Sequence, residues 1–296
     1  MKNVILHIAS RLQPAYPADE AEALAWWIAE ELSGHSRTEL LFGCKSTTNF
    51  PYLQIGDPFL EQIVDRLLHF EPIQYIFGHT IWNGLDLQLT PATLIPRPET
   101  AELVERINEK MRKCENKEIT NVFDIGSGSG CIAIALKKAH PEWQVTGIDI
   151  SPEAIEIAKQ NAARNNVSVN FQVADIFSDE IEETFTFHLS PFTLIVSNPP
   201  YICEREKKEM RPNVLNYEPA SALFVPDDDP LRFYRRIATL FSSPERRSRG
   251  VYLFFEINEA YASELSAMLS GLGYTDIQIT KDIYGKDRII EGRMTW

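Results

Sequence analysis

From about Thr120 onward, the sequence alternates short apolar runs with stretches of helical periodicity. This alternation predicts parallel β-strands joined by helices that cover both faces of one sheet. The expected strands are 120–125, 143–149, 168–173, 192–197 and 250–257, and the expected helices are 131–139, 152–165, 231–241 and 259–271. Two further strands are expected at 275–281 and 288–293, antiparallel because their connection is short. An open α/β sheet of this kind binds its ligands at the carboxyl ends of the strands.

The part of the chain before about Pro72 has a different pattern, which predicts helices and loops. Asp19 can cap a helix that Gly34 ends, and a second helix is expected at 59–70. The second helix carries an apolar stripe that is expected in a core, made of Phe59, Ile63, Leu67 and Phe70. Asn83-Gly84, between two alternating runs, predicts a β-hairpin. The expected organisation is a small helical domain over 1–78, a connecting β-hairpin over 79–91 and the main domain over 92–296.

The fourth expected strand ends in Asn198-Pro199-Pro200-Tyr201, the strongest candidate for a chemical site. Prolines cannot continue a central strand, and a residue before proline takes extended geometry, so Asn198 is expected in a stiff turn at the carboxyl edge. The Asn198 oxygen and a main-chain carbonyl can then accept both hydrogens of a substrate amino or amide group. Tyr201 can lie against a planar substrate. The alternative is a rigid corner without a chemical role.

The first expected strand of the sheet runs into a glycine-rich turn, Gly126-Ser127-Gly128-Ser129-Gly130. Glycines let the backbone approach a ligand, and the helix that follows offers unpaired N–H groups at its start. The turn lacks the Gly-Lys-Ser/Thr of a phosphate loop, and Cys131 stands where a dinucleotide pattern has glycine or alanine. Gly-x-Gly-x-Gly with Asp124 ahead of it is typical of S-adenosylmethionine sites, in which Asp124 can face the ammonium group directly or through water.

Carboxylates follow the next two strands. Asp149 can accept both ribose hydroxyls, and Asp175 can accept from the adenine amino group while Ile176 or Phe177 packs on the ring. Taken singly, Asp149 could instead cap a helix and Asp175 could be a turn residue. Together with Asn198 they follow successive strand ends along one groove, which predicts an S-adenosylmethionine site. The expected cofactor-binding residues are Gly126, Ser127, Gly128, Ser129, Gly130, Asp149, Asp175, Ile176 and Asn198.

Composition narrows the class of partner. The chain has 29 basic and 42 acidic residues and a formal charge of −13, which disfavours duplex nucleic acid as the main partner and fits a protein partner. Its four cysteines form no Cys-x-x-Cys pair and have no histidine at ligand spacing, so reduced thiols in a cytoplasmic protein and no metal site are expected. The amino terminus has too short an apolar run for a signal peptide, and no stretch approaches membrane-spanning length.

The combined motifs resemble the peptide chain release factor glutamine methyltransferases, the PrmC/HemK family. Asn-Pro-Pro-Tyr alone is shared with adenine and cytosine amino-methyltransferases, and the more particular segments lie elsewhere. The resemblance rests on Pro72-Ile73-Gln74-Tyr75-Ile76-Phe77-Gly78, Ile95-Pro96-Arg97-Pro98-Glu99-Thr100, the glycine turn after Asp124-Ile125, Asn198-Pro199-Pro200-Tyr201-Ile202 and Tyr217-Glu218-Pro219.

This resemblance implies a seven-stranded, Rossmann-like, S-adenosylmethionine-dependent methyltransferase domain with a helical amino-terminal domain and a hairpin. The implied reaction transfers a methyl group to the side-chain amide N(5) of the glutamine in the Gly-Gly-Gln motif of class 1 release factors. Substrate contacts are implied at Asn198, Pro199, Pro200 and Tyr201. In the mechanism we expect, the Asn198 side chain and the Pro199 carbonyl accept the two amide hydrogens, Tyr201 stacks on the amide plane, and no strong general base is needed.

The sequence departs from the family pattern in three places. Asn258 follows Ile257 where glycine is usual, many members have tryptophan near Ile176, and the stretch 178–191 is longer than usual. Two rival functions share the motifs. One is an exocyclic-amine methyltransferase acting on DNA or RNA, which is disfavoured because the chain is acidic and has no visible target-recognition domain. The other is a non-catalytic protein that binds the cofactor or docks a translation factor.

Overall fold

The computed structural model describes residues 1–42, 50–113, 119–181, 192–242 and 250–295. The chain divides into two compact units, one formed by 1–78 with 211–217 and the other by 79–210 with 218–296.

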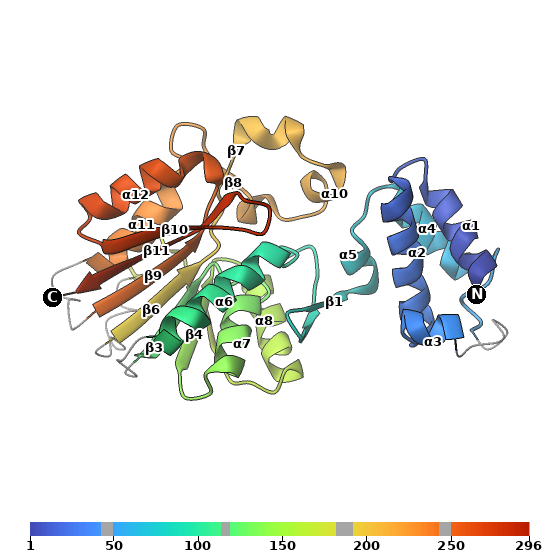
Figure 1. Ribbon diagram of the computed structural model, residues 1–296, viewed down its shortest axis with the longest axis horizontal. Helices are drawn as coiled ribbons and strands as arrows, with labels where there is room; N and C mark the ends of the chain where they lie inside the picture. The colour runs from blue at the N-terminus through green and yellow to red at the C-terminus, as the bar shows by residue number, and fades with distance from the viewer. Residues whose placement is uncertain (43–49, 114–118, 182–191, 243–249, 296) are drawn as a thin grey trace. The chain divides into compact units, whose positions relative to one another are not determined.

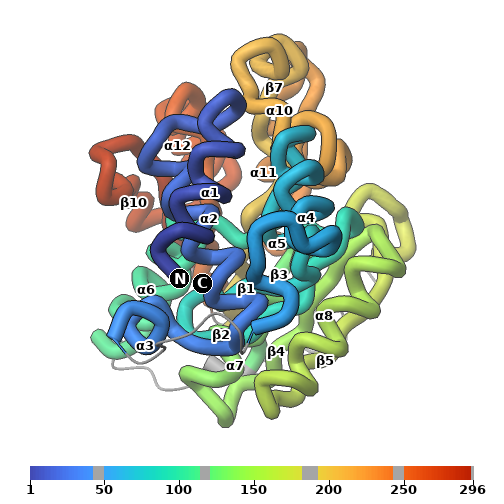
Figure 2. Tube along the Cα trace, turned by 90° about the vertical axis from the view of Figure 1, so that its right-hand side faces the viewer, coloured from blue at the N-terminus to red at the C-terminus, as the bar shows by residue number. Residues whose placement is uncertain are grey.

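The first unit is helical. Its helices are α1 (Lys2–Leu12), α2 (Ala18–Ser33), α3 (Arg37–Phe42), α4 (Pro58–Leu68), α5 (Ile73–Phe77) and α10 (Pro212–Leu215). Helices α1, α2 and α4 pack around a core that includes Ile8, Ile28 and Leu60 (Figure 1 and Figure 2). Arg211, just before α10, pairs with Glu20 of α2.

Two expectations for this unit are wrong. Asp19 makes no capping bond, because α2 already begins at Ala18 and has Pro17 as its N-cap, although Gly34 does end the helix in a left-handed conformation. Phe59 is 47% exposed instead of lying in the core, since it occupies the first turn of α4. The start of α4 is capped by Asp57, whose side chain accepts from the N–H groups of Phe59 and Leu60.

The second unit begins with the hairpin of β1 (His79–Trp82) and β2 (Leu85–Gln88), as Asn83-Gly84 predicts. Asn83 and Gly84 both have positive φ, the requirement of a two-residue hairpin turn. The Asn161 side chain accepts from the Gln88 N–H and donates to the Gln88 carbonyl, which fixes the hairpin on helix α8 (Pro152–Arg164). The hairpin thus belongs to the same compact unit as the sheet.

The described residues of this unit form a seven-stranded sheet in the order β10-β11-β9-β6-β3-β4-β5, in which β11 pairs antiparallel with both β10 and β9 and the other pairs are parallel. The strands are β3 (Ile119–Ile125), β4 (Gln144–Asp149), β5 (Asn170–Val173), β6 (Phe192–Ser197), β9 (Gly250–Glu256), β10 (Thr275–Lys281) and β11 (Asp287–Thr295). All seven predicted strands are present, and the α/β prediction is confirmed. The register places Ile125 beside Ser197 and Ile148, so the strand ends of β3, β4 and β6 meet at one edge.

Helices cover both faces of the sheet (Figure 1). One face carries α6 (Pro98–Lys113), α7 (Cys131–Ala139) and α8 (Pro152–Arg164), and the other carries α11 (Arg232–Ser242) and α12 (Ala262–Gly271). Alternate residues of a strand pack against opposite helix layers: Val122 packs with α6, α7 and α8, and Phe123 packs with α11 and α12. The predicted helix 259–271 is split into a 3₁₀ turn, η5 (Glu259–Tyr261), and α12.

The segment after β6 contains short elements that sequence patterns did not predict. It comprises β7 (Ile202–Cys203), η2 (Glu204–Glu209), η3 (Ala220–Ala222) and β8 (Phe224–Val225), and β7 pairs in parallel with β8. This pairing holds the chain next to Tyr201 in an extended conformation.

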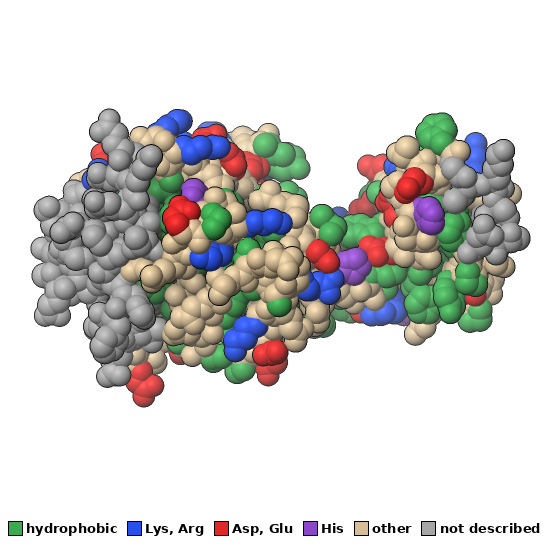
Figure 3. Space-filling model, turned by 90° about the horizontal axis from the view of Figure 1, so that it is seen from below, with side chains coloured by type: hydrophobic (Ala, Val, Ile, Leu, Met, Phe, Trp, Pro, Cys, Tyr) green, Lys and Arg blue, Asp and Glu red, His purple; other side chains and the backbone are tan. Residues whose placement is uncertain are grey.

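On the face seen in Figure 3, Lys and Arg side chains lie among Asp and Glu side chains.

Candidate active site

A cavity of about 410 Å³ lies at the carboxyl edge of the sheet. Eight of the predicted site residues line it: Gly126, Gly128, Asp149, Asp175, Ile176, Asn198, Pro199 and Pro200. They come from the ends of β3, β4, β5 and β6, as the predicted groove requires. The structure also adds lining residues that sequence reasoning missed, from 92–94, 219–224 and α11: Ala92, Leu94, Pro219, Ser221, Ala222, Phe224, Arg232, Phe233 and Ile237.

The glycine turn is shaped by its backbone. Gly126 and Gly128 have φ of 74° and 52°, in the left-handed region that favours glycine. The N–H groups of Gly126 and Ser127 both donate to the Ile148 carbonyl of β4, so the turn is fastened to the next strand. Gly130 is needed for packing, because a Cβ there would stand 2.9 Å from the Phe171 ring. Ser127, Ser129 and Gly130 are not among the residues that line the cavity.

Asp149 braces this turn from the end of β4. Its Oδ2 accepts from the Gly128 N–H at 2.8 Å, and its Oδ1 accepts from the Ser151 N–H at 2.9 Å. The cap of α8 is Ser151, whose hydroxyl accepts from the Ala154 N–H, so Asp149 is not the capping residue. Burial raises the pKa of Asp149, while these N–H groups lower it. Each carboxylate oxygen keeps a lone pair for a further donor in the cavity.

Asp124 lies behind the turn and is fully buried. Its Oδ2 accepts from the Ala133 N–H at 3.1 Å, and its Oδ1 has no partner among the described residues. Burial raises the pKa of Asp124 to about 7, and the nearby Asp149 charge adds to the effect. Asp124 is not among the cavity-lining residues. An acceptor without a partner at this depth nevertheless fits a cationic group or a water molecule carried in by a ligand.

The adenine end predicted from sequence lies beyond β5. The Asp175 side chain accepts from the Phe177 N–H, so this residue also shapes its own turn. Ile176 is buried and Phe177 is 38% exposed, with the Arg232 guanidinium 4.6 Å above the Phe177 ring. Arg236 donates to the Ile176 carbonyl and holds the segment on α11. The carboxylates can accept from the hydroxyl and amino groups of S-adenosylmethionine, the apolar side chains can pack on its ring, and the glycines allow close approach to the backbone. The site therefore fits S-adenosylmethionine.

Asn198 follows β6 and is connected to a buried carboxylate. Its Nδ2 donates to the Thr100 hydroxyl at 3.3 Å, and Thr100 donates to Glu256 Oε2 at 2.7 Å. Glu256 ends β9, is 1% exposed and accepts the Tyr201 hydroxyl at its other oxygen, at 3.1 Å. Burial raises the pKa of Glu256 and that of Tyr201. Tyr201 is not among the residues that line the cavity.

The segment with Arg97 is anchored by Glu218. Glu218 is 6% exposed, and its carboxylate accepts from the Ile95 N–H at 3.1 Å and from Arg97 at 2.6 Å. Trp82 of the hairpin donates to the Arg97 carbonyl. In the sequence, these residues stand out only as parts of motifs. The structure shows that the motif with Arg97 and the motif with Glu218 are joined by hydrogen bonds. Thr100, which follows Arg97 at the start of α6, contacts Glu256.

Asn258 is the residue at the first of the three departures from the family pattern. Its φ is −75°, a conformation open to any residue, and its side chain caps η5 by accepting from the Ala260 N–H. Glycine is therefore not required by the backbone here. Of the unusually long stretch 178–191, residues 182–191 lie outside the described part of the chain.

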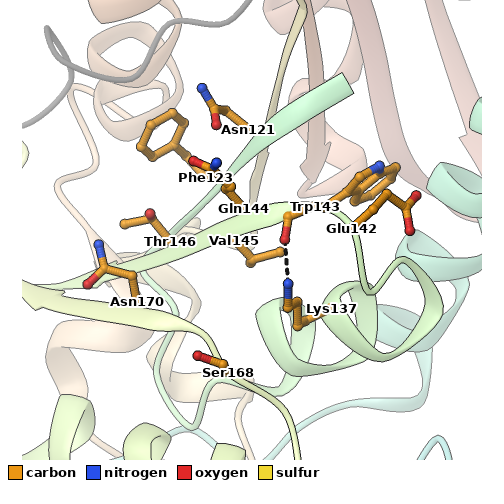
Figure 4. Close-up of a pocket in the computed structure, with 10 residues that line it drawn as sticks. All are labelled: Asn121, Phe123, Lys137, Glu142, Trp143, Gln144, Val145, Thr146, Ser168 and Asn170. Atoms are coloured by element: carbon orange, nitrogen blue, oxygen red, sulfur yellow. Dashed lines mark hydrogen bonds between the residues drawn. The ribbon is translucent and has the colours of Figure 1, made fainter. Parts of the chain in front are cut away.

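A second cavity, of about 340 Å³, lies at the opposite edge of the sheet, where β3, β4 and β5 begin (Figure 4). Its lining includes Asn121, Gln144 and Asn170 from these strand starts. The Lys137 ammonium group lies beside it and donates to the carbonyls of Pro141 and Trp143. None of the predicted site residues lines this cavity, so the ligand site is assigned to the carboxyl edge.

Within the described residues, no group of three or more His, Cys, Asp or Glu side chains is arranged to hold a metal ion. The same part of the chain contains no helix with the length and apolar character needed to cross a membrane.

Comparisons with known proteins agree with this geometry. Residues 100–216 match the family model of the methyltransferase small domain. The chain is 42% identical to a release factor glutamine methyltransferase of Bacteroides thetaiotaomicron over 98% of this chain and 99% of the relative, and 37% identical to one of Flavobacterium psychrophilum over 98% of each. A crystal structure of the hMettl16 catalytic domain in complex with an RNA hairpin shares the fold, with a TM-score of 0.53 and 14% identity over 83% of this chain and 95% of that one. With near full-length relatives at this level of identity, the chain belongs to the release factor glutamine methyltransferase family.

Proposed function

We propose that this protein transfers a methyl group from S-adenosylmethionine to the side-chain amide N(5) of the glutamine in the Gly-Gly-Gln motif of class 1 peptide chain release factors. One observation carries the proposal: Asn198 and Pro199 line the same cavity as the glycine turn, Asp149 and Asp175. A grip for a planar NH₂ group and a site suited to the cofactor are therefore adjacent. The family relationship supports a glutamine amide as the group that is gripped.

The cofactor side of the cavity is assigned to the turn and the strand ends. Gly126 and Gly128 hold the cofactor's amino acid part, and Ser127, Ser129 and Gly130 complete the turn around them. Asp149 accepts from the ribose hydroxyls, and Asp175 accepts from the adenine amino group while Ile176 or Phe177 packs on the ring. When bound, S-adenosylmethionine supplies an electrophilic methyl group on a sulfonium. All of these residues belong to the second unit, so the chemistry is assigned to this unit.

The substrate side has to overcome the poor nucleophilicity of an amide nitrogen, whose lone pair is delocalised into the carbonyl. In the proposed mechanism, Asn198 Oδ1 and the Pro199 carbonyl accept the two N–H groups and direct the nitrogen at the methyl carbon. The bound cofactor would supply the methyl group for the new N–C bond and keep the electron pair of the broken S–C bond, and one N–H proton of the amide would pass to water. Orientation and charge placement supply the rate, and the proton becomes acidic only as the bond forms. Tyr201 is proposed to stack on the amide plane, although in this structure its hydroxyl group donates to Glu256 and its side chain does not line the cavity.

The experiment supplies radiolabelled S-adenosylmethionine to the full-length protein with three substrates in separate reactions. These are a class 1 release factor, the same factor with the Gly-Gly-Gln glutamine replaced by alanine, and a mixture of DNA and RNA. Label is expected on the first factor only, and mass spectrometry is expected to place one methyl group on the glutamine. Label on nucleic acid and not on the factor contradicts the proposal. We further propose that the reaction takes place in the cytoplasm, where translation termination occurs.

A further inference from the structure

Asn198 is linked to the buried carboxylate of Glu256 through a single hydroxyl group, that of Thr100. We infer that Thr100 and Glu256 are positioning residues that fix which end of the Asn198 amide faces the cavity. This inference rests on the proposed function, in which the Asn198 oxygen accepts an N–H group of the substrate.

The contacts come from segments that are distant in the sequence. Thr100 lies in the first turn of α6, Asn198 follows β6, and Glu256 is the last residue of β9. Thr100 is 2% exposed and Glu256 is 1% exposed. Because water has little access to either side chain, Thr100 and Glu256 can form hydrogen bonds only with groups that the protein provides.

The direction of the hydrogen bonds between Asn198, Thr100 and Glu256 follows from the donors and acceptors available. The bonds from Thr100 and Tyr201 and the nearby Arg288 charge favour the ionised form of Glu256. In that form the carboxylate has no hydrogen to donate, so both hydroxyl groups that contact it donate to it. A hydroxyl has only one hydrogen, so Thr100 can offer only lone pairs to Asn198. The Asn198 side chain must therefore present its NH₂ group to Thr100.

This choice matters because the two ends of an asparagine amide are nearly equal in size. With its NH₂ group held by Thr100, the oxygen of Asn198 is left for a substrate donor. In the flipped orientation, Asn198 would present N–H groups to the N–H groups of the substrate amide. The buried carboxylate thus selects the orientation that accepts an NH₂ group, although Glu256 itself does not line the cavity.

The first test uses two substitutions at Thr100. Thr100→Val keeps the shape but removes the hydroxyl group, and Thr100→Ser keeps the hydroxyl group. We expect Thr100→Val to lower kcat roughly 10-fold, the scale of a misplaced catalytic contact, with the Kd for S-adenosylmethionine unchanged. Thr100→Ser is expected to keep kcat within about twofold of the wild type, by the same reasoning. Equal kcat for Thr100→Val and the wild type overturns the inference.

A double substitution separates positioning from a general structural role. If Thr100 acts through Asn198, Thr100→Val should cause no further loss of kcat in a protein that already carries Asn198→Ala. A further loss in the double variant as large as that caused by Thr100→Val alone would mean that Thr100 acts by another route. Thermal unfolding of each variant shows whether it is folded.

A spectroscopic measurement tests the inference without using activity. The side-chain ¹⁵N–¹H₂ signal of Asn198 can be identified by its absence from Asn198→Ala. We expect Thr100→Val and Glu256→Gln to shift this signal, because each changes the partner of the NH₂ group or that partner's polarity. Tyr201→Phe, which removes only the other contact of Glu256, should leave it in place. An unshifted signal in folded Thr100→Val or Glu256→Gln refutes the inference, whereas an unmethylated release factor with wild-type protein refutes only the proposed function.

Discussion

The two halves of the cavity are built in different ways. The cofactor half, at the ends of β3 and β4, is held by backbone groups, with Gly126 and Ser127 donating to Ile148 and Gly128 donating to Asp149. The substrate half is held by side chains from Thr100, Asn198 and Glu256, which the fold brings together. Backbone-built sites are sensitive to an added Cβ, and side-chain networks are sensitive to the loss of one polar group. Substitutions of these two kinds should therefore separate cofactor binding from turnover.

The largest effect is expected for Asn198→Ala, which removes the side-chain acceptor of the substrate half. We expect kcat to fall roughly 100-fold or more, the scale of losing an oriented polar contact in a transition state. The affinity for S-adenosylmethionine, measured by isothermal titration calorimetry, should stay near the wild-type value because the cofactor half is intact. An unchanged kcat for Asn198→Ala would contradict the proposed mechanism. A parallel loss of cofactor affinity would show that the two halves are not separable.

The second effect concerns the buried carboxyl of Asp124 in the cofactor half. An unfolded chain titrates aspartate near pH 4, whereas the pKa of Asp124 in the folded protein is raised to about 7 by burial. Between these values the folded state holds a proton that the unfolded state has released. The contribution of Asp124 to the free energy of unfolding is therefore full below about pH 4 and is lost as the pH rises to about 7, by at most about 1.4 kcal/mol per pH unit.

Asp124→Asn removes this titration and keeps an oxygen for the Ala133 N–H. Urea unfolding of both proteins at pH 5, 6 and 7 provides the measurement. The stability of the variant relative to the wild type should rise with pH over this range. A constant difference between the two proteins would mean that Asp124 stays ionised in the folded state.

Much of the cofactor half could be predicted from sequence because its determinants are local. A strand, a glycine turn and an acidic residue at the end of the next strand are each visible in a short window, and the structure places Gly126, Gly128, Asp149 and Asp175 at one cavity. The alternation of strands and helices likewise predicted all seven strands. Errors arose where a neighbouring residue decided the outcome, as at Asp19, where the helix had already begun after Pro17.

The substrate half could be predicted only in part. Asn198 was visible because two prolines follow it, but Glu256 looks like any residue at the end of an apolar strand. Its importance follows from the position of α6, which is set by packing of Leu103, Val104 and Ile107 on the sheet. The Tyr201 side chain reaches the same carboxylate from the segment that follows β6. Such long-range pairing has no signal within a single window of sequence.

The third effect tests the backbone character of the cofactor half with Gly128→Ala. Gly128 has φ of 52°, lines the cavity, and would place an added Cβ within 4 Å of no protein atom. We expect cofactor affinity to weaken roughly 10-fold because the methyl group obstructs close approach of the cofactor. The left-handed alanine costs about 1 kcal/mol of folding stability, with or without the cofactor. Gly56→Ala is the matched control, because Gly56 also has positive φ and open surroundings but belongs to the first unit. Equal cofactor affinity for the two variants would contradict a role for the Gly128 backbone in binding.

The smallest effect is expected for Asn258→Gly, which introduces the glycine that the resemblance implies at this position. Asn258 caps η5, and its side-chain nitrogen makes long contacts with the Tyr201 carbonyl at 3.3 Å and with Glu206 at 3.4 Å. Replacing an asparagine cap by glycine costs a few tenths of a kcal/mol, so chemical denaturation should detect a loss of no more than about 0.5 kcal/mol. Turnover should remain within about twofold of the wild type, because the bonds from Asn198 through Thr100 to Glu256 do not involve Asn258. A tenfold fall in kcat with normal stability would extend the positioning network to the Tyr201 backbone, and the substrate half would then depend on main-chain as well as side-chain contacts.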